Sequence, residues 1–278
     1  MTLKRLLTVA LVALSLAAVA AAPRPAAAAG ELQEIIKRGT IRIGWINSPP
    51  NSMKDPRSGE LRGTYIDGAK EMVAQMGLKV EWVETTWGTF VAGLQSGQFD
   101  FCIAGTFATL KRAMAVDFTK PIFYIGYSAI VAKDETRFAT VEDLNREGVK
   151  IAVVQGGAAE DFARRNMPKA QLVTLATGNL SAPFIEVASG RADAGLEDAN
   201  TAAHFAAQQP GVKDLFATKP FNFLPIAWTA RKGNSEVINL FNVGIDALMI
   251  SGRWAELAKP YAARGRFIDA PQYKVFGD

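Results

Sequence analysis

Side chains that catalyse reactions or bind metals are scarce in this sequence. The chain of 278 residues has one histidine, His204, and one cysteine, Cys102. His204 lies in the alanine-rich run ANTAAHFAAQQ, where a surface position is expected, and Cys102 lies in an apolar run that favours a buried, inert thiol. Nucleophilic triads and histidine-based metal sites lack their parts, and no P-loop or G-x-G-x-x-G stretch is present. We expect no catalytic site, no metal and no cofactor.

One pair of carboxylates deserves comparison with known acid/base pairs. Glu197 and Asp198 are adjacent in the run AGLED, which has the character of a strand. Neighbouring side chains on a strand point to opposite faces of the sheet. We therefore expect a poor acid/base pair.

Arg112 is the charged residue with the clearest potential to bind a ligand. Thr109 is a suitable helix N-cap, which would place Arg112 in the first turn of a helix beside free backbone N–H groups. A guanidinium at the start of a helix is a good site for a carboxylate. The alternative is a surface arginine in a salt bridge.

The elements that must position these residues alternate between strands and helices. Short apolar runs at 41–45, 80–83, 101–104, 151–154 and 172–175 predict strands. Helical spacing or capping signals predict helices over 66–76, 140–147 and 158–166. This rhythm is typical of mostly parallel sheets flanked by helices.

The two halves of the chain resemble each other. LQSGQFDFCIAG (94–105) and VASGRADAGLED (187–198) share S-G-x-x-D at the same place, and GTIRIGWIN (39–47) and GVKIAVVQG (148–156) share a glycine before a charged residue in an apolar run. The repeat makes Gly105 and Asp198 equivalent. Both are expected where a strand ends, which is where ligands bind in open α/β sheets.

Two further segments, 119–133 and 219–232, are predicted to be strands that cross between two lobes. We expect lobe 1 to comprise residues 30–123 and 224–278, and lobe 2 to comprise residues 124–223. A cleft between lobes joined in this way can open and close by hinge bending.

The first 29 residues have the layout of a secretory signal peptide. Lys4 and Arg5 precede an apolar run over 6–22, and small residues follow up to Ala29. An uncleaved membrane anchor is the alternative. Cleavage would remove three basic residues and no acidic one, so the net charge of +4 would fall to +1. A nearly neutral protein is a poor candidate for binding nucleic acid.

Several runs, taken in order, resemble one known family. They are GELRGTYIDGAKEM, LQSGQFDFCIAG, KRAMAVDFTKPIF, KIAVVQGGAAEDF and SGRADAGLED. Together they resemble family 3 of the extracellular solute-binding proteins, over nearly all of residues 38–278. The resemblance implies the type II periplasmic binding protein fold, with two Rossmann-like α/β lobes joined by two crossover strands. It also implies a monomeric periplasmic protein that captures an amino acid or related small carboxylate for an ABC transporter permease.

The resemblance assigns roles around the cleft between the lobes. Arg112 matches the arginine that clamps the ligand α-carboxylate, and Asp198 matches the aspartate that holds the α-ammonium. Trp87 matches an aromatic residue that packs against the ligand side chain. Positions whose backbone groups contact the ligand match Gly105 and Phe107 in lobe 1 and Gly157 and Ala158 in lobe 2.

The chain also departs from the family pattern. Phe107 and Gly157 stand where members usually carry Ser or Thr, and Ile46 stands where several members have an aspartate that reads the ligand side chain. The segment 44–53 is shorter than the family loop that donates a second stacking aromatic.

These departures predict a largely apolar side-chain pocket lined by Trp87, Phe107 and Ile46. Tyr65 or Tyr124 would lie at its edge. Because an unpaired charge is costly to bury against such a wall, neutral ligands should bind more tightly than lysine or arginine. A Glu197 side chain that reached into the pocket would reverse this preference.

Two other functions stay open. Some relatives that resemble this family are cyclohexadienyl dehydratases, which need a general acid in the cleft, and Glu197 or Asp198 would have to supply it. A sensor input domain fits less well, since we expect no transmembrane helix or signalling module beyond the two lobes.

Overall fold

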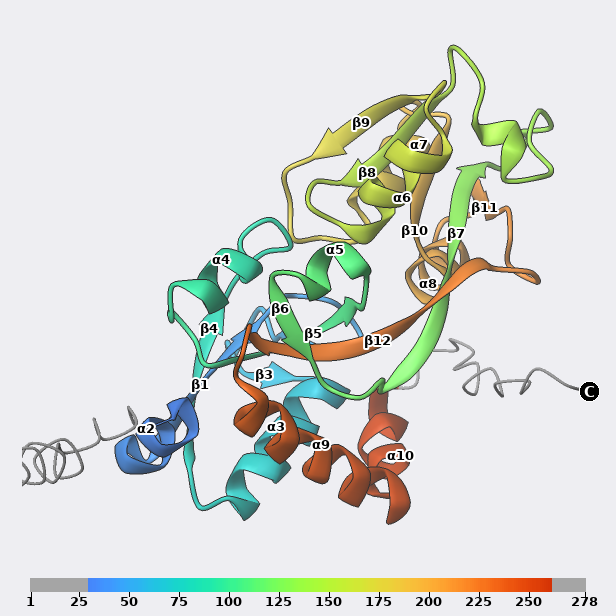
Figure 1. The fold of residues 1–278 in the computed structure, drawn as a ribbon. Helices are drawn as coiled ribbons and strands as arrows, with labels where there is room; N and C mark the ends of the chain where they lie inside the picture. Colours follow the sequence, from blue (N-terminus) through green and yellow to red (C-terminus); the bar gives the residue numbers. More distant parts are fainter. Residues whose placement is uncertain (1–29, 262–278) are drawn as a thin grey trace, which may run out of the picture.

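The computed structural model describes residues 30–261 as two α/β lobes joined by two long strands (Figure 1). The predicted signal peptide, residues 1–29, lies outside the described residues, as do residues 262–278. Because the chain crosses between the lobes twice, lobe 1 contains both ends of the described part.

Lobe 1 is built on three parallel strands. β1 (Thr40–Trp45) lies between β4 (Lys79–Glu84) and β5 (Phe101–Phe107). Alternate residues of β5 enter two apolar clusters, Phe101 and Ile103 on one face and Cys102 and Ala104 on the other. Both faces are therefore buried, as expected for a parallel sheet. The helices of this lobe are α2 (Glu31–Arg38), α3 (Thr64–Gln75), α4 (Phe90–Gln95), α9 (Ser235–Ile250) and α10 (Arg253–Ala258).

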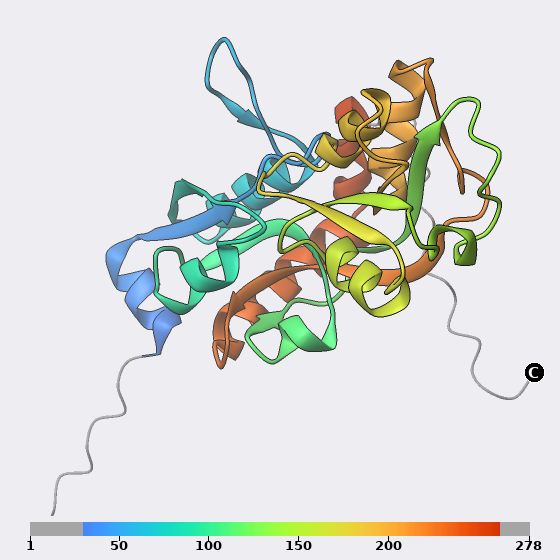
Figure 2. The ribbon, with the colours of Figure 1, turned by 90° about the horizontal axis from the view of Figure 1, so that it is seen from above.

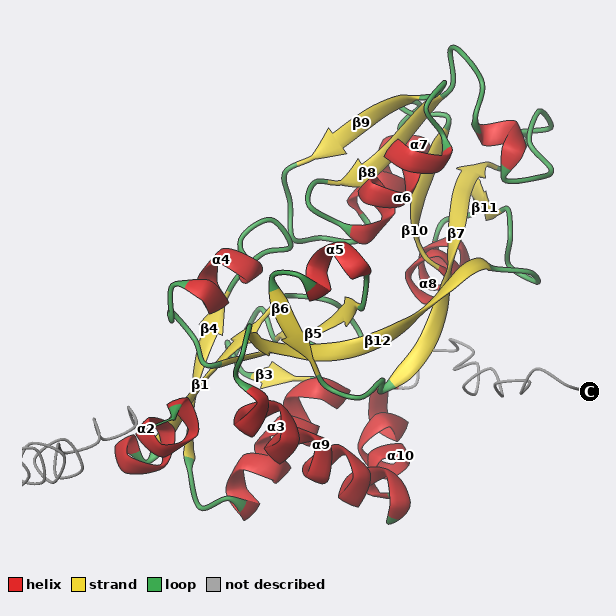
Figure 3. Cartoon of the chain, in the orientation of Figure 1, coloured by secondary structure: helices red, strands yellow, loops and turns green. Residues whose placement is uncertain are grey.

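Helices cover both faces of lobe 1. Figure 3 shows α3, α9 and α10 together on one side of the strands, with α4 on the other side. A short antiparallel hairpin, β2 (Met53–Lys54) and β3 (Leu61–Arg62), extends away from the body of the protein and is light blue in Figure 2.

Lobe 2 repeats this plan. β8 (Lys150–Val154) lies between β9 (Gln171–Leu175) and β10 (Ala194–Asp198), and both neighbours run parallel to it. Its helices are α6 (Ala158–Asn166), α7 (Ala182–Ala188) and α8 (Ala199–Gln208).

The two predicted crossing segments are strands at the centre of the molecule. β7 (Phe123–Ala132) and β12 (Phe221–Arg231) pair with each other in antiparallel fashion. β12 also pairs with β5, and β7 pairs with β10, so the order along the sheet is β4-β1-β5-β12-β7-β10-β8-β9. The remaining short elements are α5 (Leu110–Ala113), β6 (Val116–Phe118), β11 (Val212–Asp214) and the 3₁₀ turns Glu142–Leu144 and Lys259–Tyr261.

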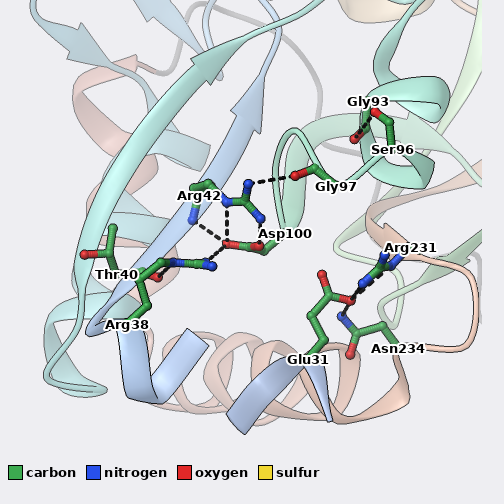
Figure 4. A network of polar contacts seen from close by, with 10 residues as sticks. All are labelled: Glu31, Arg38, Thr40, Arg42, Gly93, Ser96, Gly97, Asp100, Arg231 and Asn234. Atoms are coloured by element: carbon green, nitrogen blue, oxygen red, sulfur yellow. Dashed lines mark hydrogen bonds and ion pairs between the residues drawn. The ribbon is translucent and has the colours of Figure 1, made fainter. Parts of the chain in front are cut away.

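The S-G-x-x-D repeat has a structural meaning that is the same in both lobes. Asp100 accepts a hydrogen bond from the backbone N of Arg42 on β1 at 2.7 Å, and Asp193 accepts one from the backbone N of Lys150 on β8 at 2.8 Å. Each aspartate also pairs with arginine, as Figure 4 shows for Asp100 with Arg42 and Arg38. The aspartates therefore tie the turn before the third strand of each lobe to its central strand.

The segment predicted as a helix over 140–147 is shorter than expected. The capping box forms, since Asp143 accepts a hydrogen bond from Thr140 N at 2.8 Å and donates its own N–H to Thr140 Oγ1 at 3.3 Å. Only the 3₁₀ turn Glu142–Leu144 follows, and Leu144 is its one buried residue. A cap alone cannot sustain a helix that has no apolar face to bury.

Within residues 30–261, no helix combines the length and the apolar character that a membrane crossing requires.

Candidate functional site

A cavity of about 600 Å³, including open solvent at its mouth, lies between the two lobes. It is formed where β5 and β10 end, at the edge that the repeat predicted. All the predicted site residues except Ile46 line it. The lining residues are Ser48, Pro49, Pro50, Asn51, Tyr65, Trp87, Gly105, Phe107, Arg112, Phe123, Ile125, Gly157, Ala158, Leu180, Glu197, Asp198, Asn200, Thr201 and Ile226.

Ile46 lies behind the cavity wall instead of in it. Its side chain is fully buried in an apolar cluster with Trp87, Phe90 and Val154. Packing in the core accounts for this, because Ile46 continues the buried run at the end of β1. The polar residues Ser48 and Asn51, which follow it, line the cavity in its place.

Arg112 is held at the junction of the lobes. Thr109 caps α5 as predicted, accepting a hydrogen bond from Arg112 N at 3.3 Å. The guanidinium donates to Phe107 O at 3.2 Å and to Gly156 O at 3.1 Å, and it lies 5.7 Å from the centre of the Phe90 ring. A guanidinium has five N–H groups, so these two bonds leave others to bind a carboxylate.

The side chain of Arg112 is largely shielded from solvent. The residue is only 7% exposed, and this burial lowers its pKa, against the effect of nearby acidic groups. No salt bridge to Arg112 occurs among residues 30–261, so the alternative of a surface ion pair is wrong. An anion that enters the cavity would meet a positive charge in a medium that screens it weakly.

Asp198 ends β10 and caps α8 at the same time. Its Oδ1 accepts from Asn200 N at 3.0 Å and Thr201 N at 2.9 Å, and its Oδ2 accepts from Thr201 Oγ1 at 2.5 Å. Burial raises its pKa, while the bonds from Thr201 and Asn200 act in the opposite direction. A carboxylate oxygen has room for more than one donor, so Oδ2 can still accept a hydrogen bond from a ligand ammonium.

Glu197 shares the cavity with Asp198, and the expectation that the two would point apart is wrong. The alternation of a strand ends at Asp198, because that residue is the N-cap from which α8 begins. Glu197 is only 4% exposed. Its Oε1 accepts from Asp198 N at 3.1 Å, while Oε2 has no hydrogen-bond partner in the described part of the chain. Burial, assisted by the charge of Asp198, raises the pKa of Glu197 to about 8.

Aromatic side chains form much of the remaining wall. Tyr65 and Phe123 stack with ring centres 6.3 Å apart, and both line the cavity. A Cβ on Gly105 would lie 2.6 Å from the Tyr65 hydroxyl and ring, so a glycine is required there for the tyrosine to pack. Trp87 is buried, and its Nε1 has no partner among the described residues. Tyr65 is therefore part of the wall, whereas Tyr124 is absent from the lining.

The two lobes also touch outside the cavity. Lys111 Nζ on α5 lies 2.6 Å from Asp161 Oδ1 on α6. A Cβ on Gly156 would lie 3.0 Å from the Cα of Gly88 in lobe 1. With the Arg112 bond to Gly156 O, these contacts hold the two lobes against each other in this structure.

His204 lies on the surface and Cys102 is buried, as the sequence predicted. His204 is exposed on α8, where its ring contacts the Gln208 side chain. Cys102 is buried, and burial raises the pKa of its thiol to about 12. Phe123, Leu180, Asn200 and Thr201 were not anticipated in the site, since nothing in their sequence context distinguishes them from ordinary strand, loop and helix residues.

The sequence is similar to those of several known proteins. The chain is similar to a probable amino-acid ABC transporter periplasmic-binding protein of Sinorhizobium fredii, with 34% identity over 67% of this chain and 63% of that protein, less than two thirds of its length. It is also similar to the cyclohexadienyl dehydratase of Pseudomonas aeruginosa, with 27% identity over 71% of this chain and 73% of the enzyme.

Solved structures share the fold. An ancestral amino acid-binding protein described as a precursor of cyclohexadienyl dehydratase has 35% identity and a TM-score of 0.75, over 84% of this chain and 99% of that one. An ancestral arginine-binding protein bound to arginine has 31% identity and a TM-score of 0.73, over 81% and 99% of the two chains. The family model of the bacterial extracellular solute-binding proteins, family 3, matches residues 41–264. The chain belongs to family 3 of the bacterial extracellular solute-binding proteins.

Proposed function

We propose that the protein captures an amino acid, or a related small carboxylate, in the interlobe cavity and presents it to an ABC transporter. One observation carries this proposal: Arg112 and Asp198, from opposite lobes, line one cavity with apolar and aromatic walls. A guanidinium for the carboxylate and a carboxylate for the ammonium suit a zwitterion. The similarity to a probable amino-acid ABC transporter periplasmic-binding protein and to an arginine-binding protein supports this proposal.

The proposal includes export and hinge motion. The mature protein would start near Gly30, act as a monomer in the periplasm and deliver its ligand to a permease of the inner membrane. We infer that the lobe boundaries lie near residues 123 and 223. The chain enters lobe 2 at the start of β7 and returns to lobe 1 near the start of β12. The contacts of Lys111 with Asp161 and of Arg112 with Gly156 would form when the lobes close on the ligand.

A thermal-shift screen of the purified mature protein against the twenty standard amino acids and small carboxylates tests the proposal. A ligand at 100 times its dissociation constant adds about 2.7 kcal/mol to the free energy of unfolding. We expect at least one amino acid to raise the melting temperature in wild type and not in Arg112→Ala. A screen in which no amino acid or carboxylate has an effect would contradict the proposal.

A second function is favoured by one specific observation. Glu197 holds a proton near neutral pH in a buried site, which is a property of general acids. The similarity to cyclohexadienyl dehydratase makes this worth testing. Incubation with prephenate or arogenate should yield no aromatic product if the protein only binds solute. Product formation that Glu197→Gln abolishes would establish the enzyme instead.

A further inference from the structure

Glu197 is the least satisfied ionisable group in the cavity wall. Its carboxyl group is buried, one oxygen accepts a single hydrogen bond from Asp198 N, and the other oxygen has no partner among residues 30–261. Buried polar atoms are nearly always paired, and Glu197 is one of the residues that line the cavity, so a ligand group that displaces the local packing is a candidate partner for this oxygen.

No group in the described part of the chain fully neutralises an ionised Glu197. Glu197 interacts electrostatically with three groups of the described residues: Asp198 beside it, Arg112 on α5 and Tyr127 on β7. Asp198 is a like charge, and the Tyr127 hydroxyl has its own pKa raised by burial and by Glu197. Arg112 is positive, but within residues 30–261 its guanidinium donates to the carbonyls of Phe107 and Gly156 and not to Glu197.

The residue paired with Glu197 across the sheet does not help either. Ser128 on β7 lies directly opposite Glu197 in the register of β10. Its hydroxyl donates to the Asp214 carboxylate on β11. The hydroxyl of the residue opposite Glu197 in the sheet is therefore engaged elsewhere.

The charged side chains among the described residues that line the cavity sum to one net negative charge when Glu197 is ionised. They are Arg112, Asp198 and Glu197, so an ionised Glu197 gives the wall one positive and two negative groups. A zwitterion pairs with Arg112 and Asp198 and adds no net charge. A ligand with one further positive group would pair with all three.

We propose that Glu197 selects the ligand side chain, and that it selects an amino acid with a second positive group, such as a guanidinium or an ammonium. This inference rests on the proposed function of amino-acid capture. It reverses the preference for neutral ligands that an apolar pocket would give. The guanidinium or ammonium of the ligand would donate to the unpaired Oε2 and offset the burial of the carboxylate.

Binding of such a ligand should release a proton. With its pKa raised to about 8, Glu197 is mostly protonated at pH 7 in the ligand-free protein. A cation favours the ionised form, so binding at pH 7 would release about 0.9 proton if the bound form is fully ionised. The affinity would then rise roughly fifty-fold between pH 6 and pH 8.

L-arginine and L-citrulline are the matched probes, because they differ in charge and little in shape. Calorimetry at pH 8 should show that wild type binds L-arginine roughly thirty-fold or more tightly than L-citrulline. Glu197→Gln keeps the size of the side chain and removes the charge, so its preference should fall below about three-fold. Glu186→Gln is the control, since Glu186 pairs with Arg191 on the surface of lobe 2, outside the cavity. It should keep the wild-type preference.

A second measurement needs no variant. Calorimetry of the wild type at pH 7, in two buffers of different ionisation enthalpy, counts the protons released with L-arginine. We expect close to one proton with L-arginine and none with a neutral amino acid that binds. This result would hold even if Glu197→Gln failed to fold.

The two levels of the proposal fail separately. If wild type binds neither L-arginine nor any other standard amino acid, the proposed function is wrong and this inference falls with it. If amino acids bind but L-citrulline binds as tightly as L-arginine, or no proton is released with L-arginine, only the role of Glu197 is overturned.

Discussion

Asp198 has two roles in the structure, and they can be separated by substitution. Its Oδ1 caps α8 through the backbone N–H groups of Asn200 and Thr201, and its charge faces the cavity. Asp198→Ala removes both and should lower the free energy of unfolding by about 1 kcal/mol. Asp198→Asn keeps an oxygen for the cap, so its unfolding free energy should stay within about 0.5 kcal/mol of wild type.

Both variants should bind the ligand at least roughly thirty-fold more weakly, because each leaves the ligand ammonium without its anion. Urea unfolding and calorimetry measure the two effects independently. Equal destabilisation by Asn and Ala would mean that the cap contributes nothing, and unchanged affinity in both would mean that the ligand has no ammonium at this place.

Glu197 should make the stability of the ligand-free protein depend on pH. Burial raises its folded pKa to about 8, well above the ordinary value of 4.5, so the folded protein binds the proton more tightly than the unfolded chain does. The stabilisation is fully present below pH 4.5 and is lost as the pH rises through about 8. Relative to Glu197→Gln, which stays neutral, wild type should therefore lose stability between pH 5 and pH 8.

Urea unfolding of both proteins at pH 5, 6, 7 and 8 checks this. The comparison with the Gln variant cancels the titration of the other groups. A stability difference that stays constant over this range would show that the carboxyl ionises freely in the folded state.

At the residue scale, the sequence could indicate Arg112 and Asp198 because each follows a strand that the repeat identifies. It placed Ile46 wrongly in the pocket wall, and it left open whether Glu197 reaches into the pocket. Side chains alternate between the two faces of a strand until the strand ends. A shift of one residue in that end point therefore decides whether a nearby side chain faces the cavity or the core. That position is set by the cap of α8 and by the cluster around Trp87, both of which are tertiary features.

Among the elements, β12 contains a local irregularity that hydrophobic patterning does not reveal. Its pairing with β7 shifts between Phe221 and Leu224, and Asn222 has φ of 49°, in the left-handed region. Asn222 is exposed, so the effect of a substitution on stability should depend on its backbone conformation more than on its side-chain contacts. Asparagine tolerates this region better than other residues with a side chain, and β-branched residues tolerate it least.

Asn222→Val should therefore lower the free energy of unfolding by about 1–2 kcal/mol, while Asn222→Gly should be within about 0.5 kcal/mol of wild type. Urea unfolding compares the three proteins. Equal stability of the Val and Gly variants would show that this part of β12 adopts another conformation in solution.

The remaining elements illustrate what local signals can and cannot establish. α6 occupies the predicted range 158–166, where it buries an apolar face and has acidic residues in its first turn and basic residues in its last. The predicted helix at 140–147 had the cap without the face and became a 3₁₀ turn. In these two segments the apolar face, more than the cap, decides whether a helix forms.

For the molecule as a whole, closure depends on how closely the lobes can approach. Gly156 has φ of 73°, and a Cβ there would lie 3.0 Å from the Cα of Gly88 on the other lobe. Gly156→Ala should hold the lobes apart and weaken ligand binding about five-fold to a hundred-fold, the effect of overpacking by about 1–3 kcal/mol.

Gly148→Ala is the matched control. Gly148 has φ of 80°, but no atom lies within 4 Å of its added Cβ. It should therefore share the backbone strain of Gly156→Ala without the contact between lobes, and it should bind ligand as wild type does. Small-angle scattering with saturating ligand should show a larger radius for Gly156→Ala alone. Equal affinities in the two variants would mean that this contact plays no part in closure.

The ion pair of Lys111 with Asp161 is a weaker element of closure. Both residues are accessible to solvent, and exposed ion pairs contribute about 0–1 kcal/mol. This contrasts with Arg112, which is buried between the lobes and donates to a carbonyl on each side. Affinity should thus depend on the buried arginine far more than on the surface pair.

The most direct test of capture between Arg112 and Asp198 uses the wild-type protein and three forms of one ligand. They are the standard amino acid that binds most tightly, its amine without the α-carboxylate, and its acid without the α-ammonium. Calorimetry should show that each analogue binds at least roughly thirty-fold more weakly than the amino acid, since each leaves one buried partner unpaired. An analogue without the ammonium that bound as tightly as the amino acid would show that Asp198 does not grip the ligand, and would contradict the zwitterion site.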